Sequence, residues 1–414
     1  MQSRNRALFI IFLTVFLDLI GFGIVIPLLP RYAESFHAGG LGIGLVAAGY
    51  SLMQFLCSPL WGRLSDRIGR RPVLLACLGG FVASYLLLGF ANSLLMLFVA
   101  RLLAGACGGN IAAAQAAIAD ITPPEKRAQG MGLIGMAFGL GFILGPALGG
   151  LLVGSDPGHP RFALTGLAAA GMSLAAFLLA LVMLPETRTA ESRTAARPGF
   201  SLAALRHSLG RPNLAVLYLL FFLLFFAFSN MEATFALFLE HRFGLGARAA
   251  AGYFVLIGVI VSIMQGGLAR VLSPRFGERP VIRAGLFLMA AGLLGMALAP
   301  NPLWEALAVS LVAMGNGMNG PALLSFTSRC APVDEQGGVL GVAQGMGALG
   351  RVFGPLVGSL LFFGVPAEGF RAWLTGHHEG APHHVGAAFL CGALFMLVAG
   401  LLAWRGLKAV PSRE

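Results

Sequence analysis

Two apolar stretches of this chain carry nearly the same pattern of glycine and proline. The first stretch, 139–150, contains Gly145-Pro146, and the second, 348–359, contains Gly354-Pro355 at an offset of 209 residues. Glycines spaced four apart let two helices approach closely in a bilayer, and a proline removes one backbone donor and bends the helix. The repetition therefore predicts two related halves, each built from membrane helices.

Composition supports a membrane protein, because 57% of the residues are hydrophobic and only 11% are charged. A helix needs about 20 apolar residues to cross the hydrocarbon. Duplicated halves of this kind are typical of transporters that alternate access around a central site. We expect an all-α transmembrane fold of twelve helices in two pseudo-symmetric six-helix bundles, with spans at 7–29, 41–61, 73–91, 94–119, 130–153, 162–184, 213–239, 249–270, 280–298, 302–325, 338–363 and 385–404.

One long polar segment, 185–211, separates the sixth span from the seventh and has the Thr, Ser, Arg and Pro content of a flexible linker. It predicts an N-terminal bundle over 1–184, a C-terminal bundle over 212–405 and a tail over 406–414. Most Lys and Arg residues fall in the segments that lie on the same side as this linker. The positive-inside rule therefore predicts that both termini are cytoplasmic.

The loop between spans two and three is the most specific motif in the chain. It runs Gly62-Arg-Leu-Ser-Asp-Arg-Ile-Gly-Arg-Arg-Pro72. Asp66 and Arg70 are one helical turn apart and are able to pair, and Asp120 at the end of span four is a further partner. A simpler interpretation is that the arginines only anchor the loop at the membrane surface.

This loop resembles the signature of the major facilitator superfamily. The resemblance implies a conformational brace between the two halves in the outward-open state. In the second half the position of Asp66 falls on Pro274, so we expect the brace in the first half only. The residues assigned to the brace are Gly62, Asp66, Arg67, Gly69, Arg70, Arg71 and Asp120.

The first glycine-proline stretch resembles the antiporter signature of the same family, which is associated with export. Together with the first span and the run Ala119–Arg127, it is similar to the tetracycline-efflux branch of drug:proton antiporters. One difference from that branch is that span nine, 280–298, contains no acidic residue. The residues of the antiporter motif are Gly141, Gly145, Pro146, Gly149 and Gly150.

Three charged residues inside predicted spans are candidates for proton coupling: Asp18, Arg101 and Glu232. A carboxylate removed from water favours its protonated form, as a proton-coupled carrier requires, but Asp18 has an alternative structural role in which it stays paired. A charge near the bilayer centre costs roughly 2.5–3.5 kcal/mol, so Arg101 should face the bundle interior rather than snorkel outward. The family resemblance implies that this arginine assists proton movement.

Polar and aromatic residues spread over both halves are candidates for a substrate cavity. Interhelical hydrogen bonds explain part of this set, and the phenylalanines of span seven are equally able to face lipid. Gln344 and Arg351 are seven residues apart and share one face of span eleven. The candidate cavity residues are Gln54, Asn110, Gln115, Phe228, Phe235, Asn319, Gln344 and Arg351.

Together these patterns predict a secondary active transporter of the bacterial inner membrane. It exports a hydrophobic or amphipathic compound, drug-like or tetracycline-like, in exchange for protons by alternating access. The alternative is an exporter or facilitator of small anionic metabolites that uses Arg351. We expect a monomer without enzymatic activity, cofactor, resident metal or nucleic-acid partner, driven by the proton gradient. The outer loop 377–384 contains four histidines. The sequence is compatible with a solvated loop tip and with a metal site there.

Overall fold

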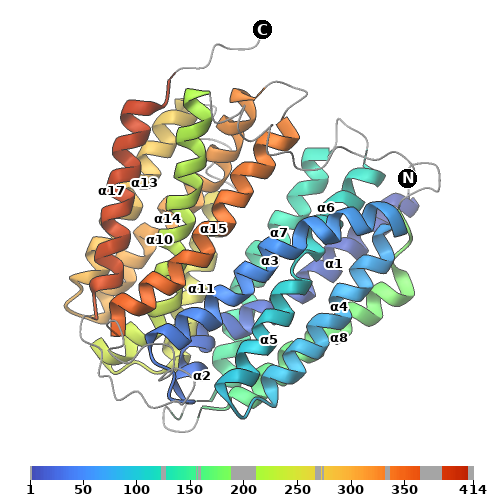
Figure 1. The fold of residues 1–414 in the computed structure, drawn as a ribbon, viewed down its shortest axis with the longest axis horizontal. Coiled ribbons are helices and arrows are strands. Elements are labelled where there is room, and N and C mark those ends of the chain that lie inside the picture. The colour runs from blue at the N-terminus through green and yellow to red at the C-terminus, as the bar shows by residue number, and fades with distance from the viewer. Residues whose placement is uncertain are drawn as a thin grey trace. The chain divides into compact units, whose positions relative to one another are not determined.

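The structure is a computed structural model that describes residues 2–122, 127–154, 156, 160–187, 211–265, 272, 275–331, 336–363 and 385–408. Within these ranges every regular element is a helix (Figure 1), which confirms the predicted all-α class. The chain divides into two compact units. Unit 1 contains the helices up to residue 183 and the segment Gly244–Gly258, and unit 2 contains the helices of the second half apart from that segment.

Unit 1 differs from the predicted spans mainly where glycine and proline interrupt a helix. The first span breaks before Pro27 into a 3-10 turn, and the fourth breaks at Gly108 and Gly109. In the described part of the first half its helices are α1 (Gln2–Val25), η1 (Ile26–Leu28), α2 (Leu29–Glu34), α3 (Gly40–Ile68), α4 (Arg70–Gly89), α5 (Leu94–Cys107), α6 (Asn110–Ile121), α7 (Arg127–Leu152) and α8 (Phe162–Met183).

Unit 2 is built from long helices with few internal breaks. Asn301 caps one of them, because its side-chain Oδ1 accepts a hydrogen bond of 2.9 Å from the backbone N–H of Trp304. The helices of the second half are α10 (Pro212–Phe243), α11 (Ala247–Ile263), α13 (Glu278–Ala297), α14 (Pro302–Cys330), α15 (Gln336–Phe363) and α17 (Ala387–Gly406). The histidine loop and most of the predicted linker lie outside the described residues.

Among the described residues, eleven helical segments are long and apolar enough to cross a membrane. The predicted eighth span, 249–270, corresponds to α11, a shorter apolar helix of 17 residues, and the last residues of that span lie outside the described ranges. The two Gly-Pro stretches belong to α7 and α15, with Pro146 and Pro355 inside the helices. The twelve predicted spans are therefore each represented by a helix.

The repeated glycines pack in the same way in both units. In unit 1 a Cβ atom added to Gly145 would lie 2.6 Å from the Cα atom of Gly23 in α1. In unit 2 a Cβ atom added to Gly354 would lie 2.9 Å from the backbone nitrogen of Asn230 in α10. Only glycine allows backbones to approach this closely, so each stretch fixes its helix against the first helix of its own half.

Candidate functional site

Asp18 lies in the interior of unit 1, with 5% of its surface exposed. Asn110 Nδ2 donates a hydrogen bond of 2.7 Å to Asp18 Oδ2, and Ser173 Oγ donates a longer one of 3.4 Å to Oδ1. The break at Gly108–Gly109 makes Asn110 the first residue of α6, which brings its amide to α1. Asp18 and Asn110 were both predicted site residues, and the structure brings them into direct contact.

Ser173 was missed by the sequence analysis. It is a fully buried serine of α8, in a span whose other residues are almost all apolar. The only signal in the sequence is a polar serine in an apolar span. Nothing in the sequence links it to Asp18, because the two residues lie 155 positions apart. The Asp18 site is therefore a three-helix cluster of α1, α6 and α8.

Arg101 is also buried, with 3% of its surface exposed, so the alternative of a side chain that snorkels outward is wrong. Its guanidinium carbon lies 4.5 Å from the ring centroid of Tyr50, within the range of a cation–π interaction. Close packing of α5 on α3 holds this pair together, because any side chain at Gly105 would collide with the Tyr50 backbone. Tyr50 in turn contacts Phe22 of α1, with ring centroids 5.0 Å apart.

The antiporter motif packs against the part of α1 that follows Asp18. Cβ atoms added to Gly141 and Gly149 would lie 2.8 Å from Leu19 Cβ and 2.6 Å from the Ile24 carbonyl oxygen. Gly150 does not face α1. The stripe of Gly141, Gly145 and Gly149 therefore holds α1 against α7 and determines where Asp18 lies.

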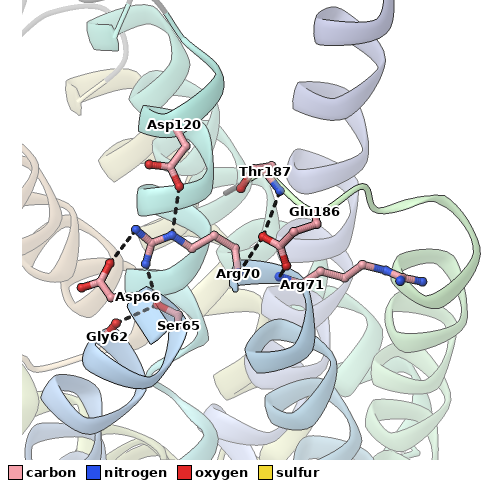
Figure 2. Close-up of polar contacts among 8 residues, drawn as sticks. All are labelled: Gly62, Ser65, Asp66, Arg70, Arg71, Asp120, Glu186 and Thr187. Atoms are coloured by element: carbon pink, nitrogen blue, oxygen red, sulfur yellow. Dashed lines mark hydrogen bonds and ion pairs between the residues drawn. The ribbon is translucent and has the colours of Figure 1, made fainter. Parts of the chain in front are cut away.

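The predicted brace residues meet where α3 ends and α4 begins (Figure 2). Arg70 is 3% exposed, and its guanidinium contacts Asp66 Oδ1 at 2.8 Å and Asp120 Oδ2 at 3.0 Å. It also donates a 2.6 Å hydrogen bond to Ser65 Oγ. The predicted ion pairs of Arg70 with Asp66 and Asp120 are confirmed.

Gly69 makes the sharp turn between α3 and α4, with φ of 110°, a conformation that side-chain-bearing residues rarely adopt. Glu186 accepts hydrogen bonds from the backbone N–H groups of Arg70 at 2.9 Å and Arg71 at 3.3 Å, and so caps the start of α4. Sequence analysis had placed Glu186 in the linker. The motif's Arg67 is exposed, and nothing in the structure explains a glycine at Gly62.

The predicted cavity residues of unit 1 and unit 2 fall into different environments. Gln115 and Gln344 are exposed, whereas Gln54 donates a 3.2 Å hydrogen bond to the Gly108 carbonyl. Phe235 is fully buried against Phe389. Of the remaining candidates, Phe228 and Glu232 are partly buried on α10, and Asn319 is fully buried against Gly285 of α13.

Arg351 lies beside α10, with its guanidinium carbon 4.6 Å from the ring centroid of Phe225. It is partly buried on α15, in the same glycine-rich stretch that packs against α10.

A second buried acid, Glu305 of α14, was missed although it lies in the first turn of a predicted span. It is fully buried, and neither of its carboxyl oxygens has a hydrogen-bond partner in the described part of the chain.

The sequence profile described as Major Facilitator Superfamily matches residues 11–355 and 268–413. The class C tetracycline resistance protein of Escherichia coli is 33% identical over 365 residues, which cover 87% of this chain and 91% of that protein. Human major facilitator superfamily domain-containing protein 10 is 32% identical over 415 residues, covering 89% of this chain and 90% of its own.

Two solved structures resemble the fold. The crystal structure of the human protein, titled an organic anion transporter, matches with a TM-score of 0.69 and 28% identity, covering 97% of this chain and 99% of the other. A bacterial homologue of the human lysosomal transporter Spinster matches over 100% of both chains with a TM-score of 0.80 at 15% identity. The second likeness concerns the fold alone.

Proposed function

This chain belongs to the major facilitator superfamily and is a multi-pass membrane transporter of small molecules rather than an enzyme. We propose that it exports a hydrophobic or amphipathic compound in exchange for protons. Its similarity to a tetracycline resistance protein supports a drug-like substrate. We place it in a bacterial inner membrane, as a monomer with both termini in the cytoplasm, and the distribution of Lys and Arg supports that orientation.

The observation that carries this proposal is the Asp18 site. A carboxylate with 5% exposure in an apolar helix is costly unless it is hydrogen-bonded or takes up a proton. Asn110 and Ser173 stabilise the charged form by donating hydrogen bonds to both oxygens. The site therefore accommodates the charged carboxylate and, after protonation, a neutral group of the same size.

We infer a transport cycle in which this site carries the proton. A proton from outside neutralises Asp18, the substrate leaves, and the emptied carrier reorients, with Glu232 as the second acid of the proposed route. The α7 glycines couple protonation of Asp18 to reorientation of the carrier, because α1 cannot move past them without repacking. The Arg70 cluster stabilises one conformation through its bonds to Asp66 and Asp120.

The test uses purified protein in proteoliposomes with an imposed pH gradient and tetracycline as the probe. We expect tetracycline addition to dissipate the gradient, and we expect Asp18→Asn to abolish that response because amides do not titrate. Asp156→Asn, the same acid-to-amide change at an exposed site of unit 1, is the matched control and should leave the response intact. If Asp18→Asn and Glu232→Gln both leave the coupling intact, the proposed proton sites are wrong.

A second candidate function is transport of small organic anions. It is favoured by Arg351, whose guanidinium lies against Phe225, and by similarity to a protein whose structure is titled an organic anion transporter. A guanidinium binds a carboxylate through two parallel hydrogen bonds, which lysine cannot reproduce. Selective loss of anion transport in Arg351→Lys would support this candidate, whereas unchanged anion transport would contradict it.

A further inference from the structure

We propose that Tyr85 of α4 is a proton-relay residue that connects Asp18 with the region of Arg101 in unit 1. The inference deepens the proton-coupled export proposed above and rests on it for the role of Asp18. Tyr85 was not among the predicted site residues. Its ring stacks on Phe81 with centroids 5.8 Å apart, so the position of the hydroxyl is fixed by packing.

Arg101 is a poor proton carrier. A guanidinium stays protonated in proteins, so it supplies a fixed positive charge rather than a transferable proton. A route that passes Arg101 and reaches Asp18 therefore needs another group that both donates and accepts a hydrogen bond. A tyrosine hydroxyl has this property.

Tyr85 of α4 lies beside the Asp18 site. A Cβ atom added to Gly21, one turn after Asp18, would lie 3.6 Å from Tyr85 Cε2 and 3.4 Å from Ser173 Oγ. Ser173 Oγ is the atom that donates to Asp18 Oδ1. The hydroxyl-bearing half of the Tyr85 ring therefore borders the Asp18 site on the same face of α1.

Within the described part of the chain, the buried hydroxyl of Tyr85 makes no hydrogen bond. Tyr85 is fully buried, and its Oη atom has no partner among the described residues. The titratable groups whose charges act on it are Asp18 of α1, Tyr50 of α3, and Arg101 and Cys107 of α5. Ser84, the residue before Tyr85, donates a 2.9 Å hydrogen bond to the carbonyl of Ala100, the residue before Arg101, so α4 and α5 pack together at this level. A buried hydroxyl without a hydrogen bond is destabilising, whereas a phenylalanine at this position would fill the same space without that cost.

Two further polar atoms around Asp18 share this property. Thr14 Oγ1 lies one turn before Asp18 on α1, and Asn110 Oδ1 belongs to the amide that bonds Asp18. Both residues are 3% exposed, and neither atom has a hydrogen-bond partner in the described chain. In the proposed relay these two atoms and Tyr85 Oη are the polar partners of a bridging water, which needs two to four of them. In each transfer the Tyr85 hydroxyl gives its proton through this water to Asp18 and accepts one proton from the side of Arg101, so Tyr85 stays neutral.

The test is infrared difference spectroscopy of the full-length protein in lipid nanodiscs, recorded between alkaline and acidic buffer. The carbonyl stretch of protonated Asp18 is identified as the band that Asp18→Asn removes. We expect Tyr85→Phe, which keeps the ring and its packing, to shift the frequency of that band. Tyr218→Phe, at a buried tyrosine of unit 2, should leave the band in place.

Transport provides the second readout. Tyr85→Phe should slow gradient-driven tetracycline exchange by at least ~100-fold, in line with the loss of a positioned proton-transfer group. A band that Asp18→Asn removes but Tyr85→Phe leaves unmoved would overturn the relay alone. Absence of any band lost in Asp18→Asn would overturn the proton-carrying role of Asp18, and with it the relay. A shifted band with unchanged transport would also contradict the relay, because it would show contact without proton transfer.

Discussion

The turn between α3 and α4 and the turn that precedes α13 are related by duplication, yet their ion pairs have opposite orientation. Both turns use a glycine at positive φ, Gly69 at 110° and Gly277 at 82°, with ψ of 162° and 157°. The next residue starts the helix in each case. In unit 1 that residue is Arg70, and in unit 2 the equivalent position holds Glu278.

The partners are exchanged as well. Arg70 pairs with Asp120, whereas Glu278 pairs with Arg329, which lies 209 residues after Asp120. Both contacts are short, at 3.0 and 2.9 Å. The sequence comparison predicted a brace in the first half only and missed this second pair, because it looked for an acid at position 274. Duplication preserved the turn and an ion pair but not the sign of the charges.

Burial separates the two pairs further. The Arg70 side chain is 4% exposed, whereas that of Arg329 is 47% exposed. Arg70 also bonds Asp66 and Ser65. An exposed pair is screened by water and contributes about 0–1 kcal/mol, while loss of one partner from a buried pair costs roughly 3–5 kcal/mol. The first pair should therefore stabilise the fold and constrain conformation, and the second should do little of either.

Exchanging the charges should give the largest difference. Arg70→Glu combined with Asp120→Arg places a carboxylate beside Asp66 and Ser65 in a buried site, so we expect a loss of about 4–5 kcal/mol in the free energy of unfolding. The same exchange in unit 2, Glu278→Arg with Arg329→Glu, should change it by less than about 1 kcal/mol. Unfolding in mixed micelles of mild detergent and dodecyl sulfate measures both. Equal losses would show that burial does not distinguish the pairs.

Removing Arg70 alone should have the next largest effect. Arg70→Ala leaves Asp66 and Asp120 without their shared cation, and we expect a cost of about 3 kcal/mol. Arg70→Lys keeps the charge but lacks the planar fork that reaches both carboxylates, so it should restore only part of that loss. Full rescue by lysine in the same unfolding assay would show that charge alone holds the junction.

Some of this junction could be predicted from the sequence and some could not. The spacing of Asp66 and Arg70 indicates one helical turn, and their pairing is local. Glu186, in contrast, lies 116 residues from Arg70 in a segment whose composition predicts a flexible linker. No local pattern indicates that its carboxylate caps α4. Contacts within one helical turn could be predicted from the sequence, whereas contacts that depend on how the helices pack together could not.

The same limit applies to the Asp18 site and to the helices. The apolar spans were placed correctly because length and hydropathy determine them. The break at Gly108–Gly109 was not predicted, since glycines are tolerated inside membrane helices and do not by themselves indicate a break. That break makes Asn110 a helix start. The contact of Asn110 with Asp18, and that of Ser173, depend on this tertiary packing.

The glycine turns should respond alike, which tests what the two junctions share. Gly69→Ala and Gly277→Ala each force a side chain into backbone conformations that are nearly exclusive to glycine, so each should cost about 1–3 kcal/mol. Gly62→Ala is the matched control, because it lies inside α3 and an added Cβ meets no atom within 4 Å. The control should be neutral or slightly stabilising. A cost at Gly69 but not at Gly277 would show that only the first turn is constrained.

The smallest effect is expected from breaking the exposed pair. Arg329→Ala leaves Glu278, whose side chain is 12% exposed and still accepts a 3.1 Å hydrogen bond from Ser325 Oγ. Because water replaces the lost cation, the free energy of unfolding should fall by less than about 1 kcal/mol, and that small loss should shrink further in high salt. A matched comparison with Arg70→Ala at the same salt concentrations separates the two junctions. A loss at Arg329 as large as that at Arg70, and insensitive to salt, would mean that unit 2 also depends on its ion pair and that the duplication preserved function together with the turn.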